Sequence, residues 1–149
     1  MDSRQIGLVR RTHRSFLPRA VRVGIAFYAR LFEADPSLRS ILQADLAALA
    51  QASLGQLRAL LEILDQPQLL ATACCELGRR QHALGLQEAH YDLFGSILLT
   101  SLRETLGTSY TDAVEAAWAS AYGELAELMI VAGQSVADTP PATTHCDAA

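Results

Sequence analysis

The side chains with the widest chemical reach in this sequence are its four histidines and three cysteines. Imidazole nitrogens and thiolates bind metal ions, and both groups can act in catalysis. His13, His90 and His145 have no metal-ligand spacing with one another or with the cysteines. No Ser–His–Asp set, phosphate-binding loop or pair of carboxylates stands out. The residues left for chemistry are Tyr28, Gln81, His82 and Tyr91.

Length and composition indicate one globular domain. The chain has 149 residues, of which 50% are hydrophobic and 19% are charged. A chain of this length buries about two-thirds of the surface that it exposes when unfolded. The net charge of −4 argues against nucleic acid as the partner, because phosphate contacts need clustered Lys and Arg.

The cysteines and the apolar stretches indicate a compartment. Cys74 and Cys75 are adjacent, so on a helix they point about 100° apart and do not pair easily with each other. An odd number of cysteines without a spaced framework favours a reducing compartment. No apolar run follows a charged start, and none reaches membrane-spanning length. We therefore expect a cytoplasmic protein with no membrane partner.

Apolar residues recur at steps of three and four along most of the chain, which predicts helices and no strand. Helix-capping residues, prolines and glycines divide the pattern. The expected helices begin at Asp2 or Ser3, after Pro18, at Asp35–Pro36, at Asp45, near Leu69, at Gln87, and at Thr111 or Asp112. We expect a domain over residues 1–133 and a polar, mobile tail over residues 134–149.

Four segments resemble the globin family. Residues 27–36 are similar to the second helix and following turn of single-domain bacterial globins and of the globin half of flavohaemoglobins. Residues 77–86 resemble the proximal helix and its corner in neuroglobin, residues 90–99 the start of the penultimate helix, and residues 117–123 the last helix of the bacterial proteins. The resemblance covers roughly residues 6–131. It implies an all-α globin fold, with six to eight helices in a three-on-three sandwich.

The resemblance also implies haem b, held through a proximal histidine. Counting from Leu77, from Gly85 and from Tyr91 places Gln81 at that position, and His82 follows it. One residue corresponds to about 100° of helix rotation, so an undistorted helix cannot turn both side chains inward. Two interpretations stay open. Either the helix end is adjusted and His82 binds the iron, or the proximal ligand is lost and His82 lies at the surface.

Other matched positions describe the rest of the expected haem site. Leu42 stands where the family keeps a phenylalanine against the haem plane, and Leu49 stands where a distal glutamine or histidine contacts bound gas. Tyr28 matches the distal tyrosine of the bacterial proteins, which hydrogen-bonds the gas. Leu77 and Leu86 complete the expected cofactor-binding residues, together with Gln81, His82 and Tyr91.

Two departures from the family pattern argue against the enzyme chemistry of flavohaemoglobins. Those proteins carry a proximal His–Tyr–Glu network, of which Tyr91 is retained. Gln81 stands in place of the histidine and Gly133 in place of the glutamate, and we expect no reductase domain. We therefore do not expect nitric oxide dioxygenation or peroxidase activity.

The leading functional hypothesis is a haem-binding globin that carries or senses oxygen or another diatomic gas, with His82 as metal ligand and Tyr28 as hydrogen-bond donor. The alternative is a haem-free globin that acts as a regulatory or protein-interaction module and forms a homodimer. A haemin-dependent Soret band distinguishes the two.

Overall fold

The computed structural model describes residues 1–138, and these residues are helical with no strand. The all-α class predicted from the apolar spacing is therefore confirmed for this part of the chain. Its elements in chain order are α1 (Ser3–Phe16), a 3₁₀ helix (Leu17–Arg19), α2 (Ala20–Ala34), α3 (Leu38–Ile41), α4 (Leu46–Glu62), α5 (Pro67–Leu84), α6 (Glu88–Leu106), a second 3₁₀ helix (Gly107–Ser109) and α7 (Asp112–Asp138).

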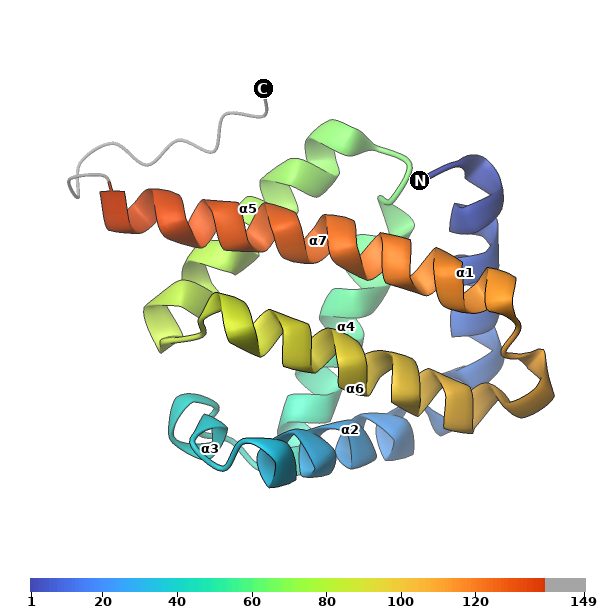
Figure 1. Ribbon diagram of the computed structural model, residues 1–149, viewed down its shortest axis with the longest axis horizontal. Helices are drawn as coiled ribbons and strands as arrows, with labels where there is room; N and C mark the ends of the chain where they lie inside the picture. The colour runs from blue at the N-terminus through green and yellow to red at the C-terminus, as the bar shows by residue number, and fades with distance from the viewer. Residues whose placement is uncertain (139–149) are drawn as a thin grey trace.

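The long helices form two crossing layers. Helices α2, α6 and α7 run side by side, and α1, α4 and α5 cross them (Figure 1). The closest helix pairs are α5 with α7 and α2 with α4, followed by α1 with α7 and α2 with α6. This is the three-on-three arrangement that the sequence predicts.

Local signals fix most helix ends. The Asp2 carboxylate accepts a hydrogen bond from the backbone N–H of Gln5, 2.8 Å away, and the Gln5 side chain accepts one from the Asp2 N–H, which completes a capping box at α1. Asp45 caps α4 through the N–H of Ala48 at 2.8 Å. Gly85 ends α5 with φ 102°, a left-handed conformation that favours glycine.

Two helix ends differ from the prediction. Asp35 does not cap a helix at Pro36. Its carboxylate accepts a hydrogen bond from the N–H of Ser37 at 3.1 Å, and α3 begins at Leu38, two residues after Pro36. Helix α7 continues past Gly133 to Asp138, because an interior glycine costs a helix only about 1 kcal/mol. The rest of the predicted mobile tail, with His145 and Cys146, lies outside the described residues.

The core has a main part and a smaller one. The main part gathers around Trp118, which is 1% exposed and donates from its indole nitrogen to the Thr12 hydroxyl at 2.8 Å. The smaller part lies where α2, α3 and α6 meet, around Leu31 and Leu38.

Within residues 1–138, no helix combines the length and apolarity needed to cross a bilayer.

Candidate ligand-binding cavity

A cavity of about 420 Å³ lies between α4 and α5. Helix α4 packs mainly on α2 and α5 mainly on α7, so these two helices do not close on each other. Exposed residues of both helices line the cavity, and it therefore reaches solvent between them. These residues are Ala52, Gln56, Arg80 and Leu84. The volume falls within the range of roughly 300–1,000 Å³ of small-molecule sites.

The inner walls are mostly apolar. They come from α2, α4, α5, α6 and α7, from the end of α3 and from the corner after α5. The side chains of Phe27, Leu42, Leu49, Leu57, Leu77, Leu86, Phe94 and Leu98 are among them. Such a lining favours an apolar ligand with few polar groups.

Tyr28 and Ser53 place two hydroxyl groups on the wall formed by α2 and α4. Their oxygens share a short hydrogen bond. The two helices approach closely nearby at Gly24, where a Cβ would lie 2.8 Å from the Ala50 Cβ. Burial raises the pKa of Tyr28, while the bond to Ser53 lowers it less, so the phenol stays protonated at neutral pH.

The opposite wall, formed by α5 and α6, carries a hydrogen-bonded chain. The Tyr91 hydroxyl donates to the Gln81 amide oxygen at 2.6 Å, and the Tyr122 hydroxyl donates to the Tyr91 backbone carbonyl at 2.6 Å. Burial raises the pKa of Tyr91 to about 12 and raises that of Tyr122 as well. Both phenols are therefore neutral donors at physiological pH.

His82 lies outside this cavity. Its side chain is exposed, and its Cβ is 3.1 Å from the place that a Cβ would take at Gly133 on α7. Gln81 is half-buried and lines the cavity. Among the described residues that line the cavity, none is a histidine.

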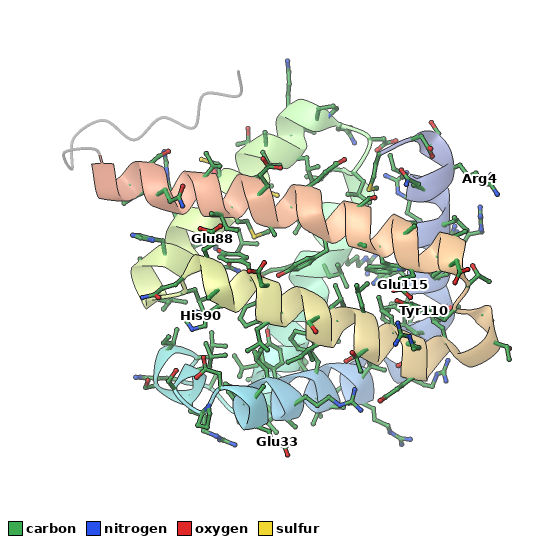
Figure 2. The ribbon with its side chains drawn as sticks, in the orientation of Figure 1. Arg4, Glu33, Glu88, His90, Tyr110 and Glu115 are labelled. Atoms are coloured by element: carbon green, nitrogen blue, oxygen red, sulfur yellow. The ribbon has the colours of Figure 1, made fainter. Side chains whose placement is uncertain are left out.

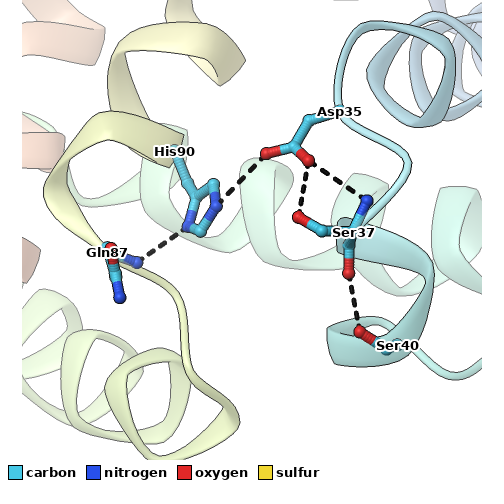
Figure 3. A network of polar contacts seen from close by, with 5 residues as sticks. All are labelled: Asp35, Ser37, Ser40, Gln87 and His90. Atoms are coloured by element: carbon cyan, nitrogen blue, oxygen red, sulfur yellow. Dashed lines mark hydrogen bonds and ion pairs between the residues drawn. The ribbon is translucent and has the colours of Figure 1, made fainter.

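The start of α6 is tied to the turn between α2 and α3. His90 reaches from the first turn of α6 toward that turn (Figure 2). Its Nδ1 accepts a hydrogen bond from the Gln87 N–H at 2.9 Å, and its Nε2 lies 3.5 Å from an Asp35 carboxylate oxygen (Figure 3). The contact supports the part of the cavity wall to which Leu42 and Leu86 belong.

The structure brings together most of the site residues that the sequence predicts. The cavity-lining ones are Tyr28, Leu42, Leu49, Leu77, Gln81, Leu86 and Tyr91. The exception is His82, whose role as metal ligand stays a prediction. Two further lining residues were not predicted: Ser53, which lies one turn after Leu49 on the same side of α4, and Arg80, which precedes Gln81.

Comparison with known proteins gives a consistent match. The sequence pattern of the Globin family fits residues 25–129, which is more than half of the chain. The chain belongs to the globin family. The predicted resemblance and the predicted globin fold are thereby confirmed.

Flavohemoproteins are among the relatives of this globin. Those of Bordetella pertussis, Chromobacterium violaceum and Rhizobium meliloti are 35%, 34% and 31% identical over 107, 111 and 106 residues. The match to the Bordetella protein covers 70% of this chain but 27% of the relative. The chain thus spans about a quarter of the length of the curated relatives that it matches.

Solved structures agree on the fold of this globin. An engineered carbene transferase from Rhodothermus marinus superposes with a TM-score of 0.81 at 25% identity, covering 93% of this chain and 96% of that one. A hexacoordinated heme protein from an anhydrobiotic tardigrade superposes with a TM-score of 0.80 at 16% identity, covering 90% of this chain and 96% of that one.

The family implies haem, and the cavity meets this expectation in part. The apolar walls fit a porphyrin ring, and the Arg80 guanidinium at the opening can pair with carboxylates. The wall of α5 presents the Gln81 amide instead of an imidazole. The residues of this globin therefore fit the ring and do not fit an iron held by histidine from α5.

Proposed function

We propose that this globin binds haem b in the cavity between α4 and α5 and, through it, a diatomic gas. The observation that carries the proposal is an open apolar cavity of about 420 Å³ that has a hydroxyl pair on one wall and a guanidinium at its opening. Family membership supports the same ligand.

Each side chain has a task in this proposal. Leu42, Leu49, Leu77 and Leu86 bury the faces of the ring, which is the main source of affinity. Arg80 holds the ring's carboxylates at the opening. Haem, when bound, supplies an iron atom that accepts a diatomic gas. The hydroxyls of Tyr28 and Ser53 offer a proton to a small ligand on the α2–α4 side.

A second candidate function is a haem-free globin that regulates by binding a partner or an apolar ligand. It is favoured by one observation: no histidine lies among the described residues that line the cavity. The two candidates share the cavity and differ in what fills it.

Haemin titration of the purified protein tests the proposal. We expect an intense Soret band that saturates at one haemin per chain. Leu98→Trp fills the cavity and should abolish the band, whereas Val131→Trp, at a position on α7 that is 55% exposed and outside the cavity, should keep it. A wild-type protein that gives no saturable band while circular dichroism shows it folded would refute haem binding and favour the second candidate.

The cytoplasmic location expected from the sequence is part of the proposal, and the homodimer belongs to the second candidate function. Fractionation of the source cells tests the location. Sedimentation of the purified protein tests the homodimer, since a chain of 16.1 kDa doubles in mass on dimerisation.

A further inference from the structure

We infer that Gln81 sets the ligand preference of this cavity: it replaces a metal ligand, so the cavity binds metal-free protoporphyrin about as tightly as haem. The inference rests on the proposed function, because it specifies what holds the ring in the same cavity. It assigns to Gln81 and Tyr91 a specificity role that differs from iron ligation.

Gln81 is committed to a neutral hydrogen bond. Its amide oxygen accepts the Tyr91 proton at 2.6 Å, and Tyr91 is itself held by packing, being 6% exposed. A neutral amide oxygen is a weak ligand for haem iron, and this one already has a donor. The backbone carbonyl of Tyr91 accepts a hydrogen bond from the Tyr122 hydroxyl, so the hydrogen-bonded pair of Gln81 and Tyr91 is held by α7 as well as by α6.

The rotation of α5 is fixed by its contact with α7. At Gly78 a Cβ would lie 2.3 Å from the Met129 carbonyl oxygen and 2.7 Å from the Met129 Cα, both of them backbone atoms. Turning His82 into the place of Gln81 needs about 100° of rotation, which would bring Arg79 into the place of Gly78. The α7 backbone leaves no room there for any side chain.

The end of α5 also resists a local adjustment. The N–H of Gly85 donates to the His82 carbonyl at 2.9 Å, and the N–H of Leu86 donates to the Gln81 carbonyl at 3.1 Å. These two bonds form a Schellman cap around the left-handed Gly85. Turning His82 inward at the helix end would break both bonds and move its side chain away from Gly133.

A ring in this cavity therefore gains its affinity from burial and from Arg80, and both contributions are the same for haem and for protoporphyrin. Where a histidine ligates the metal, the iron form binds far more tightly than the metal-free ring. Loss of even an outer-shell partner costs roughly 10–100-fold in metal affinity, so a direct ligand contributes at least about 100-fold.

The test is a comparison of two ligands and three proteins. Haemin and protoporphyrin IX are titrated by absorbance and by porphyrin fluorescence into the wild type, His82→Ala and Gln81→His. We expect wild-type affinities for the two rings within about tenfold of each other. His82→Ala should change neither affinity. Gln81→His should raise the affinity for haemin by at least about 100-fold and leave that for protoporphyrin unchanged.

The titrations distinguish a failure of this inference from a failure of the proposed haem binding. If the wild type prefers haemin by more than about 100-fold and His82→Ala removes that preference, the inference is overturned and haem binding stands. If the wild type binds neither ring while circular dichroism shows it folded, the proposed haem binding and the inference both fail. Should Gln81→His not fold, as judged by circular dichroism, the wild-type preference and the His82→Ala result still decide.

Discussion

Replacing Gly78 with alanine should destabilise the protein, although alanine is the better helix former. The added methyl group would meet the Met129 carbonyl oxygen at 2.3 Å, its Cα at 2.7 Å and its carbonyl carbon at 2.9 Å. Backbone atoms of α7 cannot move aside as a side chain can. Helix α5 must therefore shift away from α7, which is its main packing partner.

The size of the effect follows from two opposing terms. Alanine in a helix interior gains about 1 kcal/mol over glycine. Overpacking a well-filled contact costs typically about 1–3 kcal/mol, and a clash with backbone lies at or above the upper end. We expect a net loss of at least about 2 kcal/mol in the free energy of unfolding.

Gly55→Ala is the matched control, because Gly55 lies within α4 and a Cβ there would meet nothing within 4 Å. It should raise the free energy of unfolding by about 0.5–1 kcal/mol. Urea denaturation followed by circular dichroism measures both variants. If Gly78→Ala stabilises the protein as much as Gly55→Ala does, the contact with α7 does not fix the rotation of α5.

Three further outcomes are expected. Tyr122→Phe removes the hydrogen bond to the Tyr91 carbonyl and should lower the free energy of unfolding by roughly 0.5–1.5 kcal/mol in urea melts; no loss would show that this bond contributes nothing. The pKa of Asp35 is lowered, mainly by the hydrogen bond from the Ser37 hydroxyl and less by the Ser37 N–H and His90. The Asp35 carboxylate therefore stabilises the fold at pH values above its unfolded pKa of about 3.9, and this stabilisation is lost as the pH falls through the lower pKa of the folded state. The stability difference between wild type and Asp35→Asn should therefore shrink between about pH 5 and pH 2, and a constant difference would contradict this. Burial raises the pKa of the Cys74 thiol to about 11. In a variant that keeps Cys74 as its one cysteine, the thiol should therefore react slowly with a disulfide reagent at pH 8 in the folded protein and rapidly in urea. Equal rates would contradict the burial of Cys74.

The helices could be predicted from the sequence wherever local chemistry decides them. Asp2, Asp45 and Gly85 act within one helical turn, and each lies where the prediction placed it. Gly133 lies inside α7 and not at its end. It packs against His82, fifty-one positions earlier in the chain, and a local pattern does not contain that contact.

The candidate site also combines features that could be predicted from the sequence with a feature that depends on contacts between distant helices. The resemblance to globins implied that Leu42, Leu49 and Leu77 belong to one site, and all three line the same cavity. Helical periodicity could not decide which of the two side chains, Gln81 or His82, faces the cavity. That choice depends on about 100° of rotation, which the contact between Gly78 and Met129 sets across two helices.

The paired hydroxyls of Tyr28 and Ser53 have a consequence for selectivity. Each oxygen can be the donor in their shared bond. When the serine donates, the phenol's hydrogen is free to point into the cavity; when the phenol donates, the serine's hydrogen is free and the phenol offers a lone pair. Rotation about two C–O bonds thus moves the free hydrogen between the phenol oxygen and the serine oxygen, so this wall can donate to a bound molecule from either of two positions with no movement of the backbone.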